Sequence, residues 1–187
     1  MALFRGPIYL TDSVVQEICQ RAKLGYEKKM KAETFGFLFG TIDKNKRLVV
    51  KKAVYYRGGK KSRSGVIFKH WSQVWHALNR RTELANRYRL RFLGNFHSHV
   101  EIAGDVFRGL SQDDKDSFLY DPSAIIEVVV SVWASERNQV LPIRRGLAGY
   151  DPQTGYQYRI KAYTKKRNRV YQVTIKYERP KEVIISI

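Results

Sequence analysis

The segment that most constrains the fold is an apolar run, AIIEVVVSVWA, at residues 124–134. Its β-branched residues favour an extended strand. The run lacks the polar alternation of a half-exposed strand, which is typical of a strand covered on both faces. We therefore expect this segment to be a central strand of a sheet.

Helices and strands are expected to alternate along most of the chain, which ends in strands only. Helices are expected at 11–30, 69–88 and 111–119, strands at 7–10, 34–42, 47–56, 89–100 and 170–178, a hairpin at 146–163 and a basic loop at 57–65. This order predicts an α/β or α+β fold with a mixed sheet. The length of 187 residues suits one domain, and we expect a single domain over 1–187 with 146–187 as its C-terminal β-rich extension.

The net charge of +18 raises the question of a nucleic-acid partner. The bases are spread along the whole chain, whereas seven of the 17 acids lie between Asn95 and Glu127, where only two bases oppose them. This segment has a charge of −5, and the rest of the chain carries +23. An acidic segment in a basic chain indicates a cation site, with a solvated acidic loop as the alternative.

The most informative triplet is His97–Ser98–His99, which lies in an expected strand. Because side chains alternate along a strand, both imidazoles point to one face, with Cα atoms about 6–7 Å apart. Two such imidazoles can bind one divalent metal ion. Histidine pairs also occur as surface or hydrogen-bonded pairs, so the acidic segment that follows is what favours a metal site.

A catalytic zinc ion has three protein ligands and a position open to water. Asp114 is the preferred third ligand because it lies in the first turn of a helix that Ser111 can cap, so that a rigid element positions its carboxylate. The alternatives are Asp105, Asp113 and Asp116.

Glu33 is the candidate general base for a water molecule at such a site. It comes directly before the apolar strand TFGFLFGTI, where an unpaired carboxylate is costly to bury. The alternative is an exposed residue at the end of a strand.

Together these residues resemble the JAMM (MPN+) zinc metalloproteases, and in particular the prokaryotic or archaeal deubiquitinases and desampylases. The family pattern is a Glu before a GxLxG-like strand, then His-Ser/Thr-His, a spacer and Ser-x-x-Asp. In this chain the pattern reads Glu33, Gly36–Gly40, His97–Ser98–His99 and Ser111-x-x-Asp114. The resemblance covers about residues 7–134.

The resemblance implies a cytidine-deaminase-like sandwich with a curved mixed sheet flanked by helices. It implies that His97, His99 and Asp114 bind one Zn²⁺, that Glu33 holds the water and moves its proton, and that Ser111 hydrogen-bonds the oxyanion. The implied activity is that of a metallo-isopeptidase, which hydrolyses an amide or isopeptide bond.

The chain departs from the family pattern after the second histidine. Val100 stands where proline is usual, and the spacer of residues 100–110 is four residues longer than the usual seven. We expect this insertion to act as a lid or a substrate-selecting element, and it could bring Glu101 or Asp105 to the metal.

The expected partner is a ubiquitin-like protein or its conjugates, because members of this family remove or trim such proteins. Tyr55, Tyr56 and the basic loop at 57–65 are candidates to line a groove for its tail, and the +23 would steer an acidic partner. Two alternatives stay open: a basic nucleic-acid-binding module, which no nucleic-acid-binding signature favours, and a catalytically silent MPN scaffold. Adaptation to heat would also account for the charge.

We expect a cytoplasmic protein without a membrane partner. No run reaches the roughly 18 apolar residues of a membrane helix, and no secretion signal is recognised. The single Cys19 excludes an intramolecular disulfide and is expected to be a small buried hydrophobic residue. The sequence predicts no oligomeric state.

Overall fold

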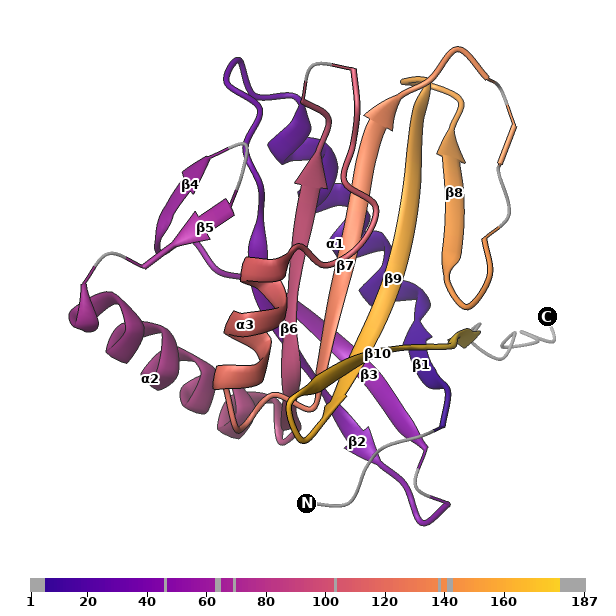
Figure 1. Cartoon of the computed structure of the whole chain (residues 1–187). Coiled ribbons are helices and arrows are strands. Elements are labelled where there is room, and N and C mark those ends of the chain that lie inside the picture. Colours follow the sequence, from indigo (N-terminus) through magenta and orange to yellow (C-terminus); the bar gives the residue numbers. More distant parts are fainter. Residues whose placement is uncertain are drawn as a thin grey trace, which may run out of the picture.

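The computed structural model describes residues 6–45, 47–62, 65–68, 70–102, 104–137, 139–140 and 143–178. The main sheet has nine strands: β1 (Ile8–Thr11), β2 (Phe35–Ile42), β3 (Leu48–Tyr55), β6 (Arg91–Val100), β7 (Ile126–Ala134), β8 (Leu147–Asp151), β9 (Tyr156–Lys166), β10 (Arg169–Val173) and β11 (Ile175–Glu178). Their order is β10-β9-β7-β6-β2-β3-β1-β11, with β8 paired to β9 (Figure 1). Strand β1 is parallel to both neighbours and β6 is parallel to β7, while the other pairs are antiparallel. The expectation of a mixed sheet is confirmed.

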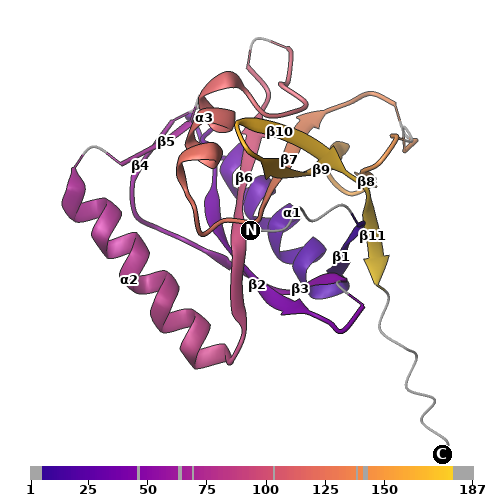
Figure 2. The ribbon, with the colours of Figure 1, turned by 60° about the horizontal axis from the view of Figure 1, so that its bottom comes forward.

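The sheet curls so strongly that it is nearly a barrel. Strands β10 and β11 are separated only by Thr174, yet they pair at opposite ends of the strand order, β10 with β9 and β11 with β1 (Figure 2). The Thr174 carbonyl accepts a hydrogen bond from the Ile8 amide at 2.9 Å and so joins the two ends. The expected continuous strand at 170–178 is therefore two strands. Its core-facing residues include Val173 and Ile175, whereas Tyr171 and Tyr177 are exposed.

Three helices flank the sheet, one on the first face and two on the second. Helix α1 (Asp12–Tyr26) buries its apolar side against one face, where it contributes Val14, Ile18 and Ala22 to the larger hydrophobic core. Helix α2 (Trp71–Tyr88) packs on the other face against an aromatic cluster that includes Phe37 and Phe39. Helix α3 (Gln112–Tyr120) lies beside α2 on that second face (Figure 1). Alternate residues of β2 and β6 thus pack into two different hydrophobic clusters, one on each face of the sheet.

Two sequence expectations about local structure are wrong. Helix α1 ends at Tyr26 instead of residue 30, because the chain turns back over Gly25, whose amide carbonyl accepts a hydrogen bond from the Ala32 amide at 3.0 Å. A Cβ atom on Gly25 would lie 2.4 Å from the Ala32 oxygen, so only glycine permits this approach. The expected basic loop at 57–65 contains strand β4 (Lys60–Ser62), which pairs with β5 (Gly65–Ile67). Residues 63 and 64 of that loop lie outside the described residues.

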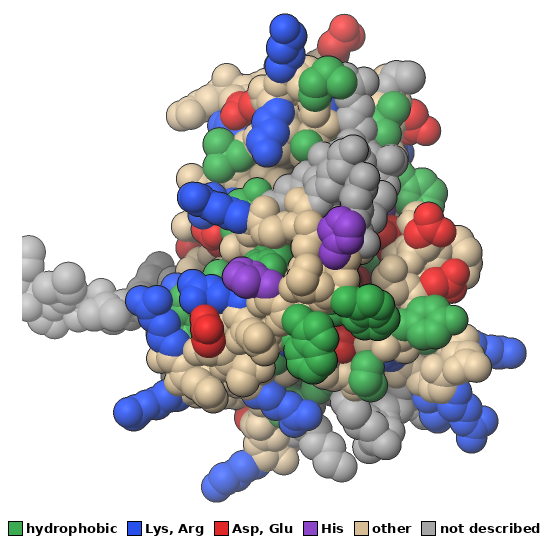
Figure 3. All heavy atoms as spheres, turned by 90° about the vertical axis from the view of Figure 1, so that its left-hand side faces the viewer, with side chains coloured by type: hydrophobic (Ala, Val, Ile, Leu, Met, Phe, Trp, Pro, Cys, Tyr) green, Lys and Arg blue, Asp and Glu red, His purple; other side chains and the backbone are tan. Residues whose placement is uncertain are grey.

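The helix expected at 69–88 is present as α2, and both of its tryptophans are largely exposed. Trp71 and Trp75 are 80% and 62% exposed, whereas Ala77 and Leu84 are buried. The space-filling view of this side of the molecule shows hydrophobic side chains at the surface beside charged ones (Figure 3). Leu24 of α1 is likewise exposed. In the described part of the chain, no helix combines the length and hydropathy needed to cross a membrane. Residues 179–187 of the expected C-terminal extension lie outside that part.

Leu38 and Ile42 lie on the same strand, β2, and test the packing of the core. Leu38 is completely buried and Ile42 is 39% exposed. We expect Leu38→Ala to lower the free energy of unfolding by about 2–5 kcal/mol, because it removes buried methyl groups and leaves a cavity. Ile42→Ala should cost about 1 kcal/mol or less. Urea denaturation followed by circular dichroism measures both, and equal losses would contradict the described burial.

Candidate metal centre

Three side chains bring one ligand atom each into a compact group. His97 and His99 are on the same face of β6, as the alternation predicts, and their Nε2 atoms are 3.2 Å apart. Asp114 in the first turn of α3 approaches both, with Oδ2 at 3.5 Å from Nε2 of His97 and 3.3 Å from Nε2 of His99. All three ligand atoms lie within 4.8 Å of one another, so the group could hold a metal ion.

A capping box holds Asp114 in place. The Ser111 amide donates to Asp114 Oδ2 at 2.8 Å, and the Asp114 amide donates to Ser111 Oγ at 3.1 Å. The sequence predicted this N-cap from Ser111 and the acids that follow it. The reciprocal bonds fix the start of the helix and the direction of the carboxylate together. Ser111 therefore reaches the ligand group mainly through Asp114.

Glu33 lies beside the ligands because its neighbour is bonded to the residue between the two histidines. The amide and the hydroxyl of Thr34 both donate to Ser98 Oγ, at 2.8 and 2.9 Å, and the Ser98 amide donates to the Thr34 carbonyl. This places Glu33 Oε1 4.0 Å from His99 Nε2. Glu33 is 6% exposed, so the alternative of an exposed residue at the strand end is wrong.

Each histidine is oriented by a second partner that the sequence analysis did not single out. His97 Nδ1 donates to Glu127 Oε1 at 2.9 Å, and His99 Nδ1 donates to the carbonyl of Phe107 at 3.1 Å. A carbonyl can only accept, so Nδ1 of His99 carries a proton, and Nε2 is the ring nitrogen that faces the ligand group. Partners of this kind commonly fix the tautomer of metal-binding histidines. The signal for Glu127 was its position as the one charged residue in the apolar run at 124–134.

The charges of the group are strongly coupled. Burial by itself lowers the pKa of His97, but hydrogen bonds to Asp114 and Glu127 raise it to about 10. Burial by itself would raise the pKa of Asp114, but hydrogen bonds from the two imidazoles hold it far below its usual range. Burial raises the pKa of Glu33 to about 8, with Asp114 adding to this effect and His97 opposing it. Three carboxylates around two imidazoles fit a divalent cation, which would take the place of the proton that His97 Nε2 otherwise holds.

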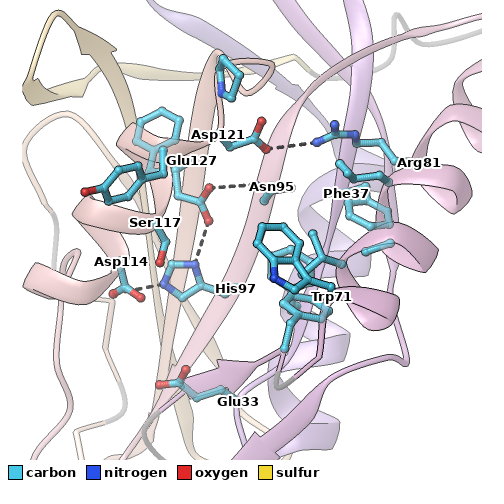
Figure 4. Close-up of a pocket in the computed structure, with 18 residues that line it drawn as sticks. Glu33, Phe37, Trp71, Arg81, Asn95, His97, Asp114, Ser117, Asp121 and Glu127 are labelled. Atoms are coloured by element: carbon cyan, nitrogen blue, oxygen red, sulfur yellow. Dashed lines mark hydrogen bonds and ion pairs between the residues drawn. The ribbon is translucent and has the colours of Figure 1, made fainter.

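A cavity of about 570 Å³ opens beside the ligands, between β2, α2 and α3. Its apolar walls include Phe35, Phe37 and Phe118, and its floor includes Glu33 and His97 (Figure 4). Other lining residues are Phe68, Trp71, Val74, Ala77, Leu78, Arg81, Asn95, Asp114, Ser117, Tyr120, Asp121, Pro122 and Glu127. In the close-up, Asp114 of α3, Glu127 of β7 and Glu33, from the segment before β2, lie around His97. His97 and Asp114 of the ligand group thus line a largely apolar pocket.

The other acids of the acidic segment are directed elsewhere. Asp113 and Asp116 are exposed on α3, and Asp105 accepts a hydrogen bond from the Val106 amide. Glu101 accepts from the Tyr26 hydroxyl at 2.5 Å, and its Oε2 lies 3.6 Å from Lys31 Nζ. The idea that the insertion brings Glu101 or Asp105 to the metal is therefore wrong. The described part of the insertion instead contributes the Phe107 carbonyl.

The predicted groove residues do not line the cavity. Tyr56 is buried in the aromatic cluster under α2, and Tyr55 lines a separate hollow with Arg21, Lys52 and Tyr88. The described residues of the loop at 57–65 are likewise absent from the walls of the cavity. The position of the cavity therefore depends on α2 and α3.

No protein-family model matches the chain, and no curated protein matches its sequence. Solved structures do match. One of them is the solution structure of protein DSY2949 from Desulfitobacterium hafniense, with a TM-score of 0.58 and 20% sequence identity. The match covers 94% of this chain and 95% of that chain. At this identity the likeness concerns the fold, which the two chains share over nearly their whole length.

Metal content tests the ligand group directly. We expect the purified protein to bind about one divalent ion per chain, and His99→Ala and Asp114→Ala each to abolish this binding, because two remaining ligands hold such an ion poorly. Asp113→Ala is the matched control, since Asp113 is the exposed neighbour of Asp114 in the same helical turn. Elemental analysis after dialysis gives the stoichiometry. Unchanged metal content in both ligand variants would contradict the site.

Glu127→Gln tests the partner of His97. The amide keeps the shape of the side chain but removes the charge that stabilises the Nδ1 proton, and we expect metal affinity to fall about 10–100-fold. Asp116→Asn is the control, because Asp116 is exposed on α3. Competition titration with a metallochromic indicator measures both affinities. An equal effect in the two variants would show that Glu127 does not act through the histidine.

Proposed function

We propose that the protein is a zinc-dependent peptidase or isopeptidase that removes or processes ubiquitin-like proteins. The observation that carries this proposal is the position of Glu33, a buried carboxylate 4.0 Å from a ligand group of two histidines and one aspartate. This ligand set is found in catalytic zinc sites and also in non-haem iron sites. A carboxylate base beside the ligands, together with the resemblance to the JAMM metalloproteases, favours hydrolysis and zinc.

His97, His99 and Asp114 would hold the zinc ion. When bound, zinc supplies Lewis-acid polarisation of the scissile carbonyl and lowers the pKa of a coordinated water. The protein's own part is to keep both Nε2 lone pairs directed at the ion, through Glu127 and the Phe107 carbonyl. The curved mixed sheet, with helices on both faces, supports the finer assignment to the cytidine-deaminase-like sandwich of that family.

Glu33 serves as the general base and acid. Its carboxylate accepts the proton of the attacking water and returns it to the leaving amine nitrogen. Burial, which raises the pKa of Glu33 to about 8, makes its carboxylate a stronger base than an exposed glutamate. The bonds between Thr34 and Ser98 keep it at the ligand group.

Ser111 is the proposed donor to the oxyanion of the tetrahedral intermediate. Its Oγ accepts from the Asp114 amide, which leaves the hydroxyl proton free to be donated. Donors directed at a developing oxyanion lower the barrier because they need no reorganisation during the reaction. This role is in addition to capping α3.

The substrate is proposed to be the tail of a ubiquitin-like protein. The 570 Å³ cavity, lined by Phe35, Phe37 and Phe118, suits an apolar side chain of such a tail. The excess of basic residues outside the acidic segment would steer an acidic protein. A silent scaffold is disfavoured by the presence of the base as well as all three ligands.

Hydrolysis of a ubiquitin-like fusion tests the function. We expect cleavage that a chelator abolishes and Zn²⁺ restores, and we expect Glu33→Gln to lower kcat at least about 100-fold while the metal content stays near that of the wild type. Asp113→Asn controls for a general loss of acidic charge near the site. Gel assays and mass spectrometry identify the cleaved bond. Equal activity with Glu33→Gln, or with chelator present, would overturn the zinc-hydrolase proposal.

A further inference from the structure

A cluster of cations shares the sheet face of the metal centre. In the sheet register Arg159 of β9 pairs with Ser131 of β7, and Ser131 pairs with His99 of β6. Directly paired residues point to the same face of a sheet, so the side chains of Arg159 and His99 lie on one face, two strands or about 10 Å apart. Lys161 is two residues further along β9 and points the same way. Figure 1 shows β6, β7 and β9 in this order.

Arg108 completes the cluster from the segment that follows β6. Its guanidinium lies 5.2 Å from the centroid of the Trp133 ring, and that of Arg159 lies 5.8 Å from the same centroid. The segment is tied to the metal centre, because the neighbouring Phe107 carbonyl accepts hydrogen bonds from both His99 and Ser131. The cations therefore have a fixed position relative to the ligand group.

The three cations have no carboxylate partner among the described residues. Burial, and after it the charge of Arg108, lowers the pKa of Arg159. The pKa of Lys161 is lowered by burial and then by the two arginines. Like charges held this close repel one another, and an anion placed between them would relieve the repulsion.

Arg159 also has an unsatisfied donor. Its Nε atom is buried and has no hydrogen-bond partner among the described residues. A buried donor of this kind is costly, and it is uncommon in folded proteins. The planar guanidinium can also pair with a carboxylate through two parallel hydrogen bonds from its terminal Nη1 and Nη2 atoms, which leaves the buried Nε aside.

We propose that Arg108, Arg159 and Lys161 form a subsite that binds a carboxylate of the peptide substrate, about three residues from the hydrolysed bond. This inference rests on the proposed peptidase function. An extended peptide advances about 3.3 Å per residue, so three residues span the roughly 10 Å between the β6 and β9 positions. The carboxylate is that of an acidic side chain or that of the chain's own C-terminus, since both present the same pair of oxygens.

The two subsites lie on opposite sides of the ligands. The apolar cavity lies on the α2 side of His97, bounded by β2 and the two helices. The cations lie on the β9 side of the same face, across β7. A peptide that fills both therefore crosses the metal centre, with its apolar residue on one side of the hydrolysed bond and its carboxylate on the other.

Binding to the Glu33→Gln variant, loaded with zinc, tests the subsite without turnover. The probes are the amidated hexapeptides Leu-Gly-Gly-Ala-Ala-Glu and Leu-Gly-Gly-Ala-Ala-Gln, and the hexapeptide Leu-Gly-Gly-Ala-Ala-Ala with a free or an amidated C-terminus. We expect each carboxylate peptide to bind about tenfold more tightly than its neutral counterpart by calorimetry. The two pairs distinguish a side-chain carboxylate from a chain end.

The same preference should depend on the cluster. Arg159→Gln and, independently, Lys161→Gln should remove the difference within each peptide pair and leave the affinity of the neutral peptides unchanged. Arg169→Gln, at an exposed position on β10, should keep the difference. In the otherwise wild-type enzyme, Arg159→Gln and Lys161→Gln should each raise KM for carboxylate peptides more than for the neutral ones.

The outcomes separate this inference from the proposed function. Equal binding of the paired peptides, or no binding of any, overturns the subsite even when a ubiquitin-like fusion is cleaved. A carboxylate preference without any hydrolysis keeps the subsite and counts against the peptidase. If a single-stranded oligonucleotide binds more tightly than the peptides, and this binding depends on Arg159 and Lys161, the cations form a phosphate site and the carboxylate subsite is overturned.

Discussion

The site depends on the position of β6 in the middle of the sheet, between β2 and β7. A carboxylate lies on each side of the histidine pair: Glu33, two residues before β2, and Glu127 on β7. Backbone hydrogen bonding fixes the register, so the imidazoles cannot move relative to these carboxylates without breaking the ladder. A metal-binding group on strands buried in this way is held more firmly than one on loops.

Burial raises the electrostatic cost of this arrangement. Glu33, His97, His99 and Glu127 are each less than 10% exposed, and Asp114 faces them from α3. Burial raises the pKa of Glu33, with Asp114 adding to this effect, whereas the hydrogen bonds to Asp114 and Glu127 raise the pKa of His97 against the effect of burial. A divalent ion can compensate the negative charge of several carboxylates at once, whereas a shared proton compensates only one. The charge of the donors, as well as their geometry, is thus suited to a metal ion.

The larger hydrophobic core and the candidate site lie on opposite faces of the sheet. Helix α1 and the larger hydrophobic core occupy one face and contain no ligand of the proposed site. The other face holds the apolar cavity under α2 and α3, the metal centre on β6 and the cation cluster on β9, in that order across the strands. The insertion after the second histidine crosses this face and supplies the Phe107 carbonyl. Its contribution is to position His99 and Arg108.

The sequence alone determined those features that depend on local periodicity. The strand alternation placed His97 and His99 on one face, and the Ser-x-x-Asp spacing placed Asp114 in a capped helical turn, because both follow from the geometry of one element. Most elements were predicted for the same reason. The end of α1 was missed because the contact of Gly25 with Ala32 across a turn leaves no trace in the helical periodicity, and the division of the last strand was missed because Thr174 bonds to Ile8 at the other end of the chain.

Only the tertiary structure decided which residues far apart in the chain meet. The alternation of side chains along a strand predicts which face each residue lies on, but not which strand lies beside it. The pairing of β6 with β7, and of β7 with β9, therefore had to be known before Glu127 and Arg159 could be linked to the histidines. The direction of Glu33 likewise depended on the bonds between Thr34 and Ser98, 64 residues apart. The sequence therefore named the candidate ligands and the candidate base, while the fold selected among the acids and assembled their partners, because strand register is a long-range property of the sheet.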